Sequence, residues 1–317
     1  MNPNLNSQRD IALDLASRHG VMLAGEAITY EHALRPTDVS LSEETAGIMQ
    51  GCRMLGFLEH DAKCIANAWH AQSLRTGEFS VRNWPRLPQD YGVASVPRSN
   101  AFPACPQHLG LYAVLPNAAW VARMAQAGVP TVQLRFKSDD VSDIRREVRA
   151  AVQAVQGTQS LLFINDHWQI AVEEGAYGVH LGQEDMDVAQ LDSIRAAGLR
   201  LGLSTHGYVE MLRADAVSPS YMALGAVFPT TLKRMQTAPQ GIGRLSAYTQ
   251  LMQHLPLVAI GGIDEARIPL VMQSGVGSIA VVRAITGATD PEQAAQMLHG
   301  LIQRHLQGTS HFSKVMT

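Results

Sequence analysis

From residue 109 onward, short apolar runs alternate with amphipathic stretches of helical period, and this alternation constrains the fold more than any other feature. Strands that are each followed by a helix-like segment form a parallel sheet. Eight such runs are the number that closes a (β/α)₈ barrel, and about 205 residues is near the lower size limit of that fold. An open doubly wound sheet is the alternative, but no G-x-G-x-x-G turn follows the first run. The predicted strands are 109–115, 131–136, 161–165, 178–181, 201–204, 221–225, 257–261 and 278–282.

The chain before residue 109 has a different pattern. Residues 8–78 are mostly helical in period, most clearly over 42–56 and 60–76. Five of the 15 prolines fall between Pro85 and Pro106, and proline fixes φ and removes a backbone donor, so we expect an extended connector there. The sequence therefore predicts a helical accessory domain over 1–82, a proline-rich linker over 83–107 and a catalytic TIM barrel of the α/β class over 108–317.

Composition narrows the functional classes. The chain is 46% hydrophobic and 17% charged, with a net charge of −3 and no broad basic face for nucleic acid. No signal-peptide core or bilayer-length apolar run is present, so we expect no membrane partner. Cys52, Cys64 and Cys105 are far apart, which argues against a disulfide framework or zinc site and favours a reducing cytoplasm. Small-molecule substrates are the expected partners, and homo-oligomerisation stays open.

Polar residues recur where the predicted strands end. In a barrel of this class, the loops at the carboxyl ends of the strands build the site. Polarity at any single strand end is ordinary, but cations, carboxylates and glycines that recur at the same end indicate a binding site. These positions are Gln133, Arg135, Lys137, Asn165, Asp166, Asp185, Ser204, His206, Gly261, Gly262 and Arg283, together with the loop 228–241.

The cations and carboxylates indicate a site for a diphosphate. Arg135, Lys137 and Lys233, the last on the hydroxyl-rich loop, bring three positive charges to one mouth. Asp166 and Asp185 end adjacent strands, so their carboxylates can share a hard cation such as Mg²⁺, which bridges phosphates. Either aspartate alone is better explained as a helix cap or turn acceptor, but the pair beside three cations favours the metal.

Other positions remain ambiguous. Gly261 and Gly262 offer backbone N–H groups to a monophosphate, or simply make a tight turn. His206 is better explained as a hydrogen-bonded histidine at the rim than as a catalyst. The aromatic residues Tyr112, Trp120 and Trp168 are interpreted as packing residues without a chemical role.

The barrel segment, about 109–305, resembles the thiamine phosphate synthase family over nearly its whole length. The motifs that match lie at 133–137, 163–166, 178–185, 204–206, 224–230, 238–241 and 259–263. The resemblance implies a transferase of thiamine biosynthesis that couples a hydroxymethylpyrimidine diphosphate to a thiazole phosphate, releasing pyrophosphate.

The resemblance also implies a role for each matching residue. The pyrimidine diphosphate would be held by Gln133, Leu134, Arg135, Phe136, Lys137, Asn165, Ser204 and Lys233, among which Arg135, Lys137, Ser204 and Lys233 would be catalytic. Asp166 and Asp185 would hold Mg²⁺. The thiazole phosphate would meet Thr230, Thr231, Leu232, Gly262, Val282 and Arg283.

Two departures from the family pattern fall on the thiazole-phosphate side. The family loop usually has a second Thr where this chain has Leu232, and a Ser where it has Arg283. A lost hydroxyl-to-phosphate hydrogen bond costs about 1.5–3 kcal/mol, which a bidentate contact from Arg283 can replace. We hypothesise a compensated, active site. The alternatives are a non-catalytic sensor of the pyrimidine diphosphate and a thiazole tautomerase-like relative. Intact Asp166, Asp185 and Lys233 argue against the tautomerase-like relative.

The N-terminal helices carry a weaker resemblance, over about 36–78, to the end of hydroxymethylpyrimidine phosphate kinase. That family has a Gly-Thr-Gly-Cys anion hole where this chain has Pro36, Thr37, Asp38 and Val39. Proline lacks an N–H and aspartate adds a negative charge, so a phosphate is disfavoured there. The segment is interpreted as a remnant or accessory domain, and an unrelated helical cap is the alternative.

Overall fold

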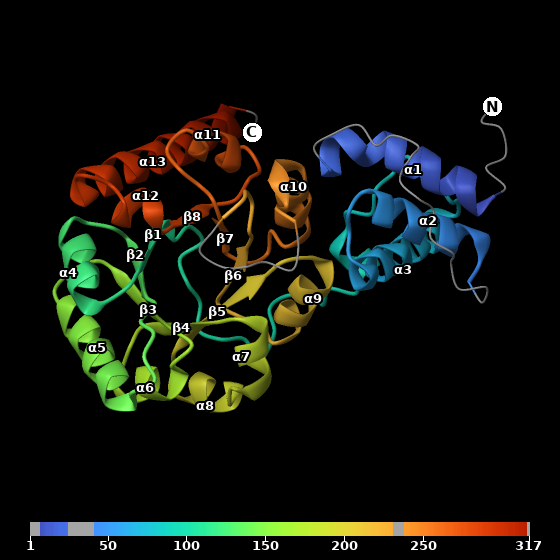
Figure 1. The fold of residues 1–317 in the computed structure, drawn as a ribbon. Coiled ribbons are helices and arrows are strands. Elements are labelled where there is room, and N and C mark those ends of the chain that lie inside the picture. The colour runs from blue at the N-terminus through green and yellow to red at the C-terminus, as the bar shows by residue number, and fades with distance from the viewer. Residues whose placement is uncertain (1–6, 25–40, 231–237, 316–317) are drawn as a thin grey trace.

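A computed structural model describes residues 7–24, 41–230 and 238–315, and within these ranges eight parallel strands close a barrel in chain order (Figure 1). Strand β8 pairs with β1 to complete the ring. All eight predicted strands are present, with ends that differ from the expectation by at most two residues, and the predicted (β/α)₈ fold is confirmed. The strands are β1 (Gly110–Leu115), β2 (Thr131–Leu134), β3 (Leu161–Asn165), β4 (Gly178–Leu181), β5 (Arg200–Thr205), β6 (Tyr221–Leu224), β7 (Leu257–Ile260) and β8 (Ser278–Val281).

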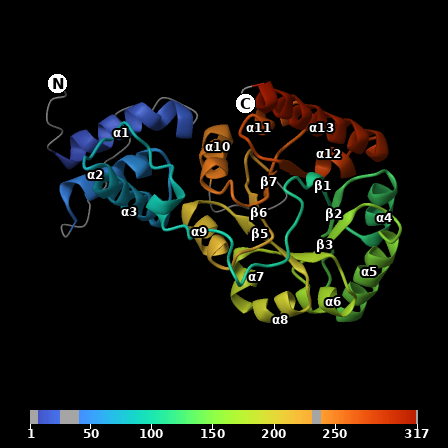
Figure 2. The ribbon, with the colours of Figure 1, turned by 180° about the vertical axis from the view of Figure 1, so that it is seen from behind.

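Helices surround the barrel (Figures 1 and 2), and three more precede it among the residues that the structure describes. The preceding helices are α1 (Gln8–Leu23), α2 (Glu43–Met54) and α3 (Glu59–Thr76), which confirms the helical prediction for this part. The barrel helices are α4 (Ala118–Gln126), α5 (Val141–Ala154), α6 (Trp168–Glu173), α7 (Gln183–Val188), α8 (Leu191–Ala196), α9 (Tyr208–Ala216), α10 (Gly241–Leu251), α11 (Ile268–Met272), α12 (Arg283–Thr286) and α13 (Pro291–Val315).

The strands are buried on both faces. Tyr112, Phe163 and Tyr221 fill the barrel interior, while a larger apolar layer separates the strands from the helices. Burial on both faces is why these strands read as continuous apolar runs rather than as an alternating pattern. The parallel register brings the carboxyl ends of all eight strands to one mouth.

The proline-rich connector has no regular structure except one 3₁₀ turn, Pro88–Tyr91. It nevertheless packs closely on the barrel: Trp84 donates to the Tyr208 hydroxyl (3.1 Å), and the Tyr91 ring stacks on that of Tyr208. Buried residues of the N-terminal helices belong to the same apolar cluster as the barrel's outer core. The boundaries 1–82, 83–107 and 108–317 therefore stay a prediction.

Within the described part of the chain, no helix is both long and apolar enough to cross a membrane.

Candidate active site

A cavity of about 1000 Å³ opens at the carboxyl ends of the strands, where the sequence predicted the site. It receives residues from every strand end or from the loop that follows it. The predicted site residues that line it are Gln133, Arg135, Lys137, Asn165, Asp166, Asp185, Ser204, Thr230, Gly262, Val282 and Arg283.

The floor of the cavity is a chain of hydrogen bonds across the barrel interior. Ser204 Oγ lies 2.8 Å from His180 Nε2, and His180 Nδ1 lies 2.6 Å from the Tyr221 hydroxyl. That hydroxyl shares a bond of 2.7 Å with the hydroxyl of Tyr112, which donates to Gln133 Oε1 (2.9 Å). Gln133 Nε2 then donates to Asn165 Oδ1 (2.8 Å).

The donors and acceptors in this series of hydrogen bonds can be assigned consistently. Because Tyr112 donates to Gln133, its oxygen accepts from Tyr221, whose oxygen in turn accepts from His180 Nδ1. His180 Nε2 is then the acceptor for the Ser204 hydroxyl. These proton positions are inferred from the hydrogen-bond network. In this arrangement Ser204 Oγ can accept a hydrogen bond from another donor, such as a ligand N–H.

Small residues make room for these rings. A Cβ at Gly202, which pairs with Tyr221 across β5 and β6, would overlap the Tyr221 ring. A Cβ at Gly178 would lie 2.5 Å from the Phe163 ring. Alternating small and large residues fill a barrel of this size without voids. Here the space left by glycine lets the Tyr221 ring place its hydroxyl inside the barrel.

The two predicted metal ligands lie together in the cavity. Burial, followed by the neighbouring charge of Asp185, raises the pKa of Asp166. Asp166 also adopts a left-handed backbone (φ 62°), uncommon outside glycine. Asp185 accepts from the Gly182 N–H at 3.2 Å. Two carboxylates that repel each other in this way are stabilised when a cation lies between them.

The turn after β7 is held by close packing. Gly261 (φ 105°) and Gly262 (φ 64°) both have positive φ. A Cβ at Gly262 would lie 2.6 Å from the Pro229 carbonyl oxygen, and one at Gly261 would lie 2.5 Å from Ala226 Cβ. Glycine is therefore required for the contact with the loop after β6, and the phosphate role of these residues stays a prediction.

His206 has the partners expected of a structural histidine at the rim. Its Nδ1 lies 2.6 Å from Glu210 Oε2, which also accepts from the His206 backbone N–H (2.9 Å). Its carbonyl accepts from Gln240 Nε2 (2.7 Å). Burial alone would raise the pKa of Glu210, but the contacts with His206 outweigh it and the pKa is lowered.

Several predicted residues are not brought to the cavity. Leu134 is buried in the outer core, and Phe136 packs against that core, because successive residues of an extended segment face opposite ways. Neither of them lines the cavity, so a contact through their backbone stays a prediction. Thr231, Leu232 and Lys233 lie outside the described residues, as do Pro36 to Val39.

Sequence reasoning missed four side chains of the cavity. Tyr112 does pack against Phe163, as expected, but its hydroxyl also belongs to the hydrogen-bond chain, so the interpretation without chemistry was incomplete. His180 and Tyr221 were read as parts of buried strands, and only barrel closure brings them together. Arg267 was missed because it lies beyond the β7 turn, where it donates to the Gly262 carbonyl and lies 4.7 Å over the Phe228 ring.

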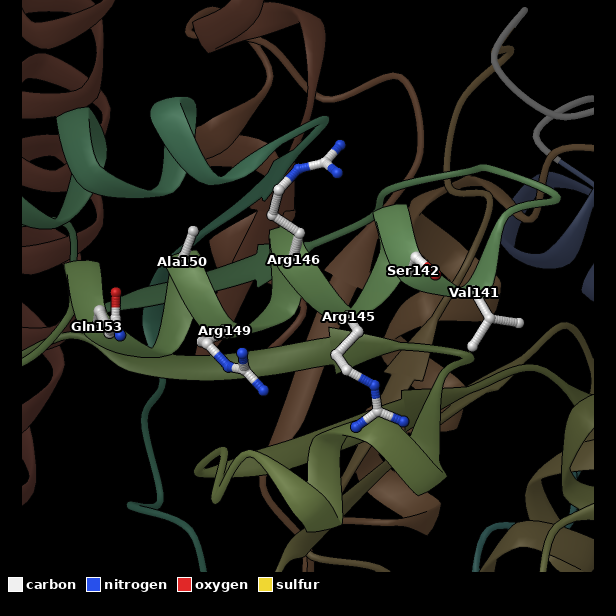
Figure 3. A pocket seen from close by; sticks show the side chains of 7 residues that line it. All are labelled: Val141, Ser142, Arg145, Arg146, Arg149, Ala150 and Gln153. Atoms are coloured by element: carbon white, nitrogen blue, oxygen red, sulfur yellow. The ribbon is translucent and has the colours of Figure 1, made fainter.

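A second hollow, of about 350 Å³, lies on the outer face of α5 (Figure 3). Arg146 points away from Arg145 and Arg149 there. Arg145 pairs with Glu173, Arg149 with Glu174 (2.8 Å) and Arg146 with Asp143 (2.7 Å). Because each guanidinium has a carboxylate partner, this is a solvated helix face rather than an anion site.

The fold and this mouth define a (β/α)₈-barrel protein with cationic side chains and a carboxylate pair in one cavity. Comparison with known proteins narrows the class. The profile described as thiamine monophosphate synthase matches residues 111–285. A thiamine-phosphate synthase of Neisseria meningitidis serogroup B is 52% identical over 200 residues, covering 63% of this chain and 98% of the relative. One of Yersinia pestis (strain Pestoides F) is 50% identical over 199 residues, covering 62% of this chain and 93% of the relative.

A solved structure gives the same result. Thiamine phosphate pyrophosphorylase from Pyrococcus furiosus is 28% identical, covers 62% of this chain and 97% of its own, and superposes with a TM-score of 0.56. The chain belongs to the thiamine monophosphate synthase family.

Proposed function

We propose that this protein is a thiamine-phosphate synthase, a transferase of thiamine biosynthesis. Its substrates would be 4-amino-2-methyl-5-(diphosphooxymethyl)pyrimidine and 4-methyl-5-(2-phosphoethyl)thiazole or its carboxylated form. The bond between the pyrimidine methylene carbon and the diphosphate oxygen breaks, and pyrophosphate leaves with the electron pair. The thiazole nitrogen supplies the pair for the new C–N bond. Family membership and the two relatives named above support this reaction.

One observation carries the proposal. A single cavity contains Arg135, Lys137 and the paired carboxylates of Asp166 and Asp185, beside a floor that ends on Asn165 and Ser204. Pyrophosphate departure builds negative charge on oxygen, and cations placed beforehand stabilise that charge where it develops. Lys233, outside the described residues, is proposed as a third cation.

The carboxylate pair fits Mg²⁺. Among the side chains that the structure describes, no group of three or more His, Cys, Asp or Glu could hold a metal alone. Mg²⁺ is commonly held by one or two carboxylates, with water and substrate phosphates as further ligands. Asp166 and Asp185 would hold it, and when bound it would neutralise charge on the diphosphate.

The hydrogen-bonded floor orients the pyrimidine. Asn165 and Ser204 are fixed from below by Gln133 and His180, at 2.8 Å in each case. Polar groups held in this way lose little entropy when a ligand binds, and they place the methylene carbon for attack. Buried partners also keep each side chain in one rotamer.

The thiazole phosphate would bind on the opposite side of the mouth. Thr230, Gly262, Val282 and Arg283 all line the cavity. We propose that Arg283 supplies the phosphate contact that the family serine makes, compensating for the departures at positions 283 and 232. The guanidinium matches two phosphate oxygens at once, whereas a hydroxyl reaches one.

The free thiols of Cys52, Cys64 and Cys105 support a cytoplasmic location, which we also propose.

The test is pyrophosphate release by the purified protein with Mg²⁺ and both substrates, with thiamine phosphate identified by mass. Turnover in the parent that disappears in Asp166→Ala is the expected result. Binding of the pyrimidine diphosphate without product would refute the synthase and leave a sensor.

A further inference from the structure

The N-terminal helices contact the barrel at two particular helices. Helix α3 packs on α9 and α1 packs on α10, and both views of the molecule place α1–α3 beside this pair. Helix α9 follows β5, which carries Ser204, and α10 follows the connection after β6, which carries Thr230. The helical domain thus touches the two helices that follow neighbouring parts of the cavity wall.

Arg244 of α10 is the centre of the first contact. It is buried, with Nε donating to the carbonyl of Leu23 (3.0 Å) and Nη2 to that of Leu55 (2.7 Å). Leu23 ends α1 and Leu55 caps α2, so one guanidinium satisfies the carbonyl ends of two helices, where a positive charge is favoured. The guanidinium also lies 4.0 Å from the centre of the Phe57 ring.

The backbones in this contact touch. A Cβ at Gly243 would overlap the carbonyl oxygen of Met22, and atoms of a main chain cannot turn aside as a flexible side chain can. The start of α10 therefore cannot carry a side chain at Gly243 while α1 keeps its position.

Asp61 of α3 is the centre of the second contact. Its Oδ1 accepts from the Val209 N–H (2.9 Å) in the first turn of α9, and a Cβ at Gly207 would overlap its other oxygen. A carboxylate at a helix N-terminus satisfies a free donor and complements the helix dipole. Asp61 therefore serves as a cap that α9 does not obtain from its own N-cap, Gly207.

The two contacts meet at the connection after β6. Gln240, the last residue before α10, donates through Nε2 to the His206 carbonyl and accepts through Oε1 from Tyr248 (3.0 Å). The Gln240 and Gly241 N–H groups donate to the carbonyls of Ala226 and Val227. These bonds join the starts of α9 and α10 to the segment that leads to Pro229 and Thr230.

We propose that Asp61 and Arg244 are positioning residues, through which the N-terminal helical domain fixes the thiazole-phosphate side of the cavity. The proposal rests on the proposed function for the identity of the ligand. The pyrimidine side is held differently, by the hydrogen-bond chain inside the barrel. Displacement of the helical domain should therefore weaken the thiazole phosphate more than the pyrimidine diphosphate, most of whose proposed contacts come from other strand ends.

Gly243→Ala tests this in the full-length protein. It adds one methyl group that drives α1 from α10 and deletes no hydrogen-bonding group. Gly308→Ala is the matched control, because Gly308 also lies in a helix and its Cβ would meet nothing within 4 Å. We expect KM for the thiazole phosphate to rise about tenfold in Gly243→Ala and KM for the pyrimidine diphosphate to change much less. Both should be unchanged in the control.

A merely structural role predicts a different result. A smaller folded fraction lowers the apparent kcat and leaves both KM values unchanged, so that outcome overturns the proposal. Arg244→Lys gives the same readout if Gly243→Ala does not fold, because Lys keeps the charge but not the forked donors. Calorimetric titration of thiazole phosphate, with Mg²⁺ and pyrophosphate present, should show the same loss of affinity. A parent that binds both substrates without turnover would refute the proposed function but leave this titration decisive.

Discussion

The hydrogen-bond chain across the barrel predicts a specific cost for Tyr221→Phe. Burial raises the pKa of Tyr221 well above its usual value, so its hydroxyl stays protonated and able to donate. The substitution keeps the ring, which packs edge-on to Phe163 at 5.1 Å between centroids, and removes only the oxygen. Two hydrogen bonds are lost, to Tyr112 (2.7 Å) and His180 (2.6 Å).

Each buried hydrogen bond contributes about 0.5–1.5 kcal/mol, so the variant should lose about 2 kcal/mol of unfolding free energy. For a domain of this size, that corresponds to a fall in Tm of about 4–8 °C. Because His180 no longer has the Tyr221 oxygen as acceptor, Ser204 should also be less well oriented. We expect KM for the pyrimidine diphosphate to rise by about threefold to tenfold through this loss.

The assay is thermal unfolding followed by circular dichroism, with steady-state kinetics on the same preparations. Tyr177→Phe is the matched control, since Tyr177 packs on Phe163 but has no part in the chain between Ser204 and Asn165. A Tyr221→Phe protein with the same Tm and the same KM as this control would refute the argument that the chain stabilises and orients the floor.

Four further predictions concern charge. Burial and the charge of Asp185 raise the pKa of Asp166. This carboxyl therefore contributes to stability below its unfolded pKa, and the contribution is lost as pH rises through its folded pKa. In the absence of metal, Asp166→Asn should match or exceed the parent in Tm at pH 7.5. Saturating Mg²⁺, about 100 times Kd, should stabilise only the parent, by about 2.7 kcal/mol, and equal shifts would exclude Asp166 as a ligand. Arg283→Ser should weaken thiazole phosphate about tenfold to a hundredfold by calorimetry, and unchanged affinity would contradict compensation. Burial alone would raise the pKa of Asp215, but His254 (2.8 Å) and Arg98 (2.7 Å) outweigh it and the pKa is lowered. Asp215→Asn should therefore be less stable than the parent above pH 4, and acid-unfolding curves should show this difference disappear at lower pH.

Much of the site could be predicted because strand order and strand ends are local properties. Arg135 and Lys137 lie at the end of one apolar run, and Asp166 follows the next. In a parallel barrel every strand points the same way, so the ends of all the runs meet at one mouth whatever the details of packing. The sequence therefore determined the fold, the mouth and most of the charged residues that line it.

Only the tertiary structure decided which side chains touch. Tyr112, His180 and Tyr221 lie on β1, β4 and β6, and their contact depends on barrel closure and on the space left by Gly202. Likewise, Asp61 and Arg244 are 183 residues apart, and nothing in either local sequence shows that both hold helices beside the same connection. Periodicity encodes the direction in which a residue faces, whereas a hydrogen bond between distant residues depends on the packing of the whole chain.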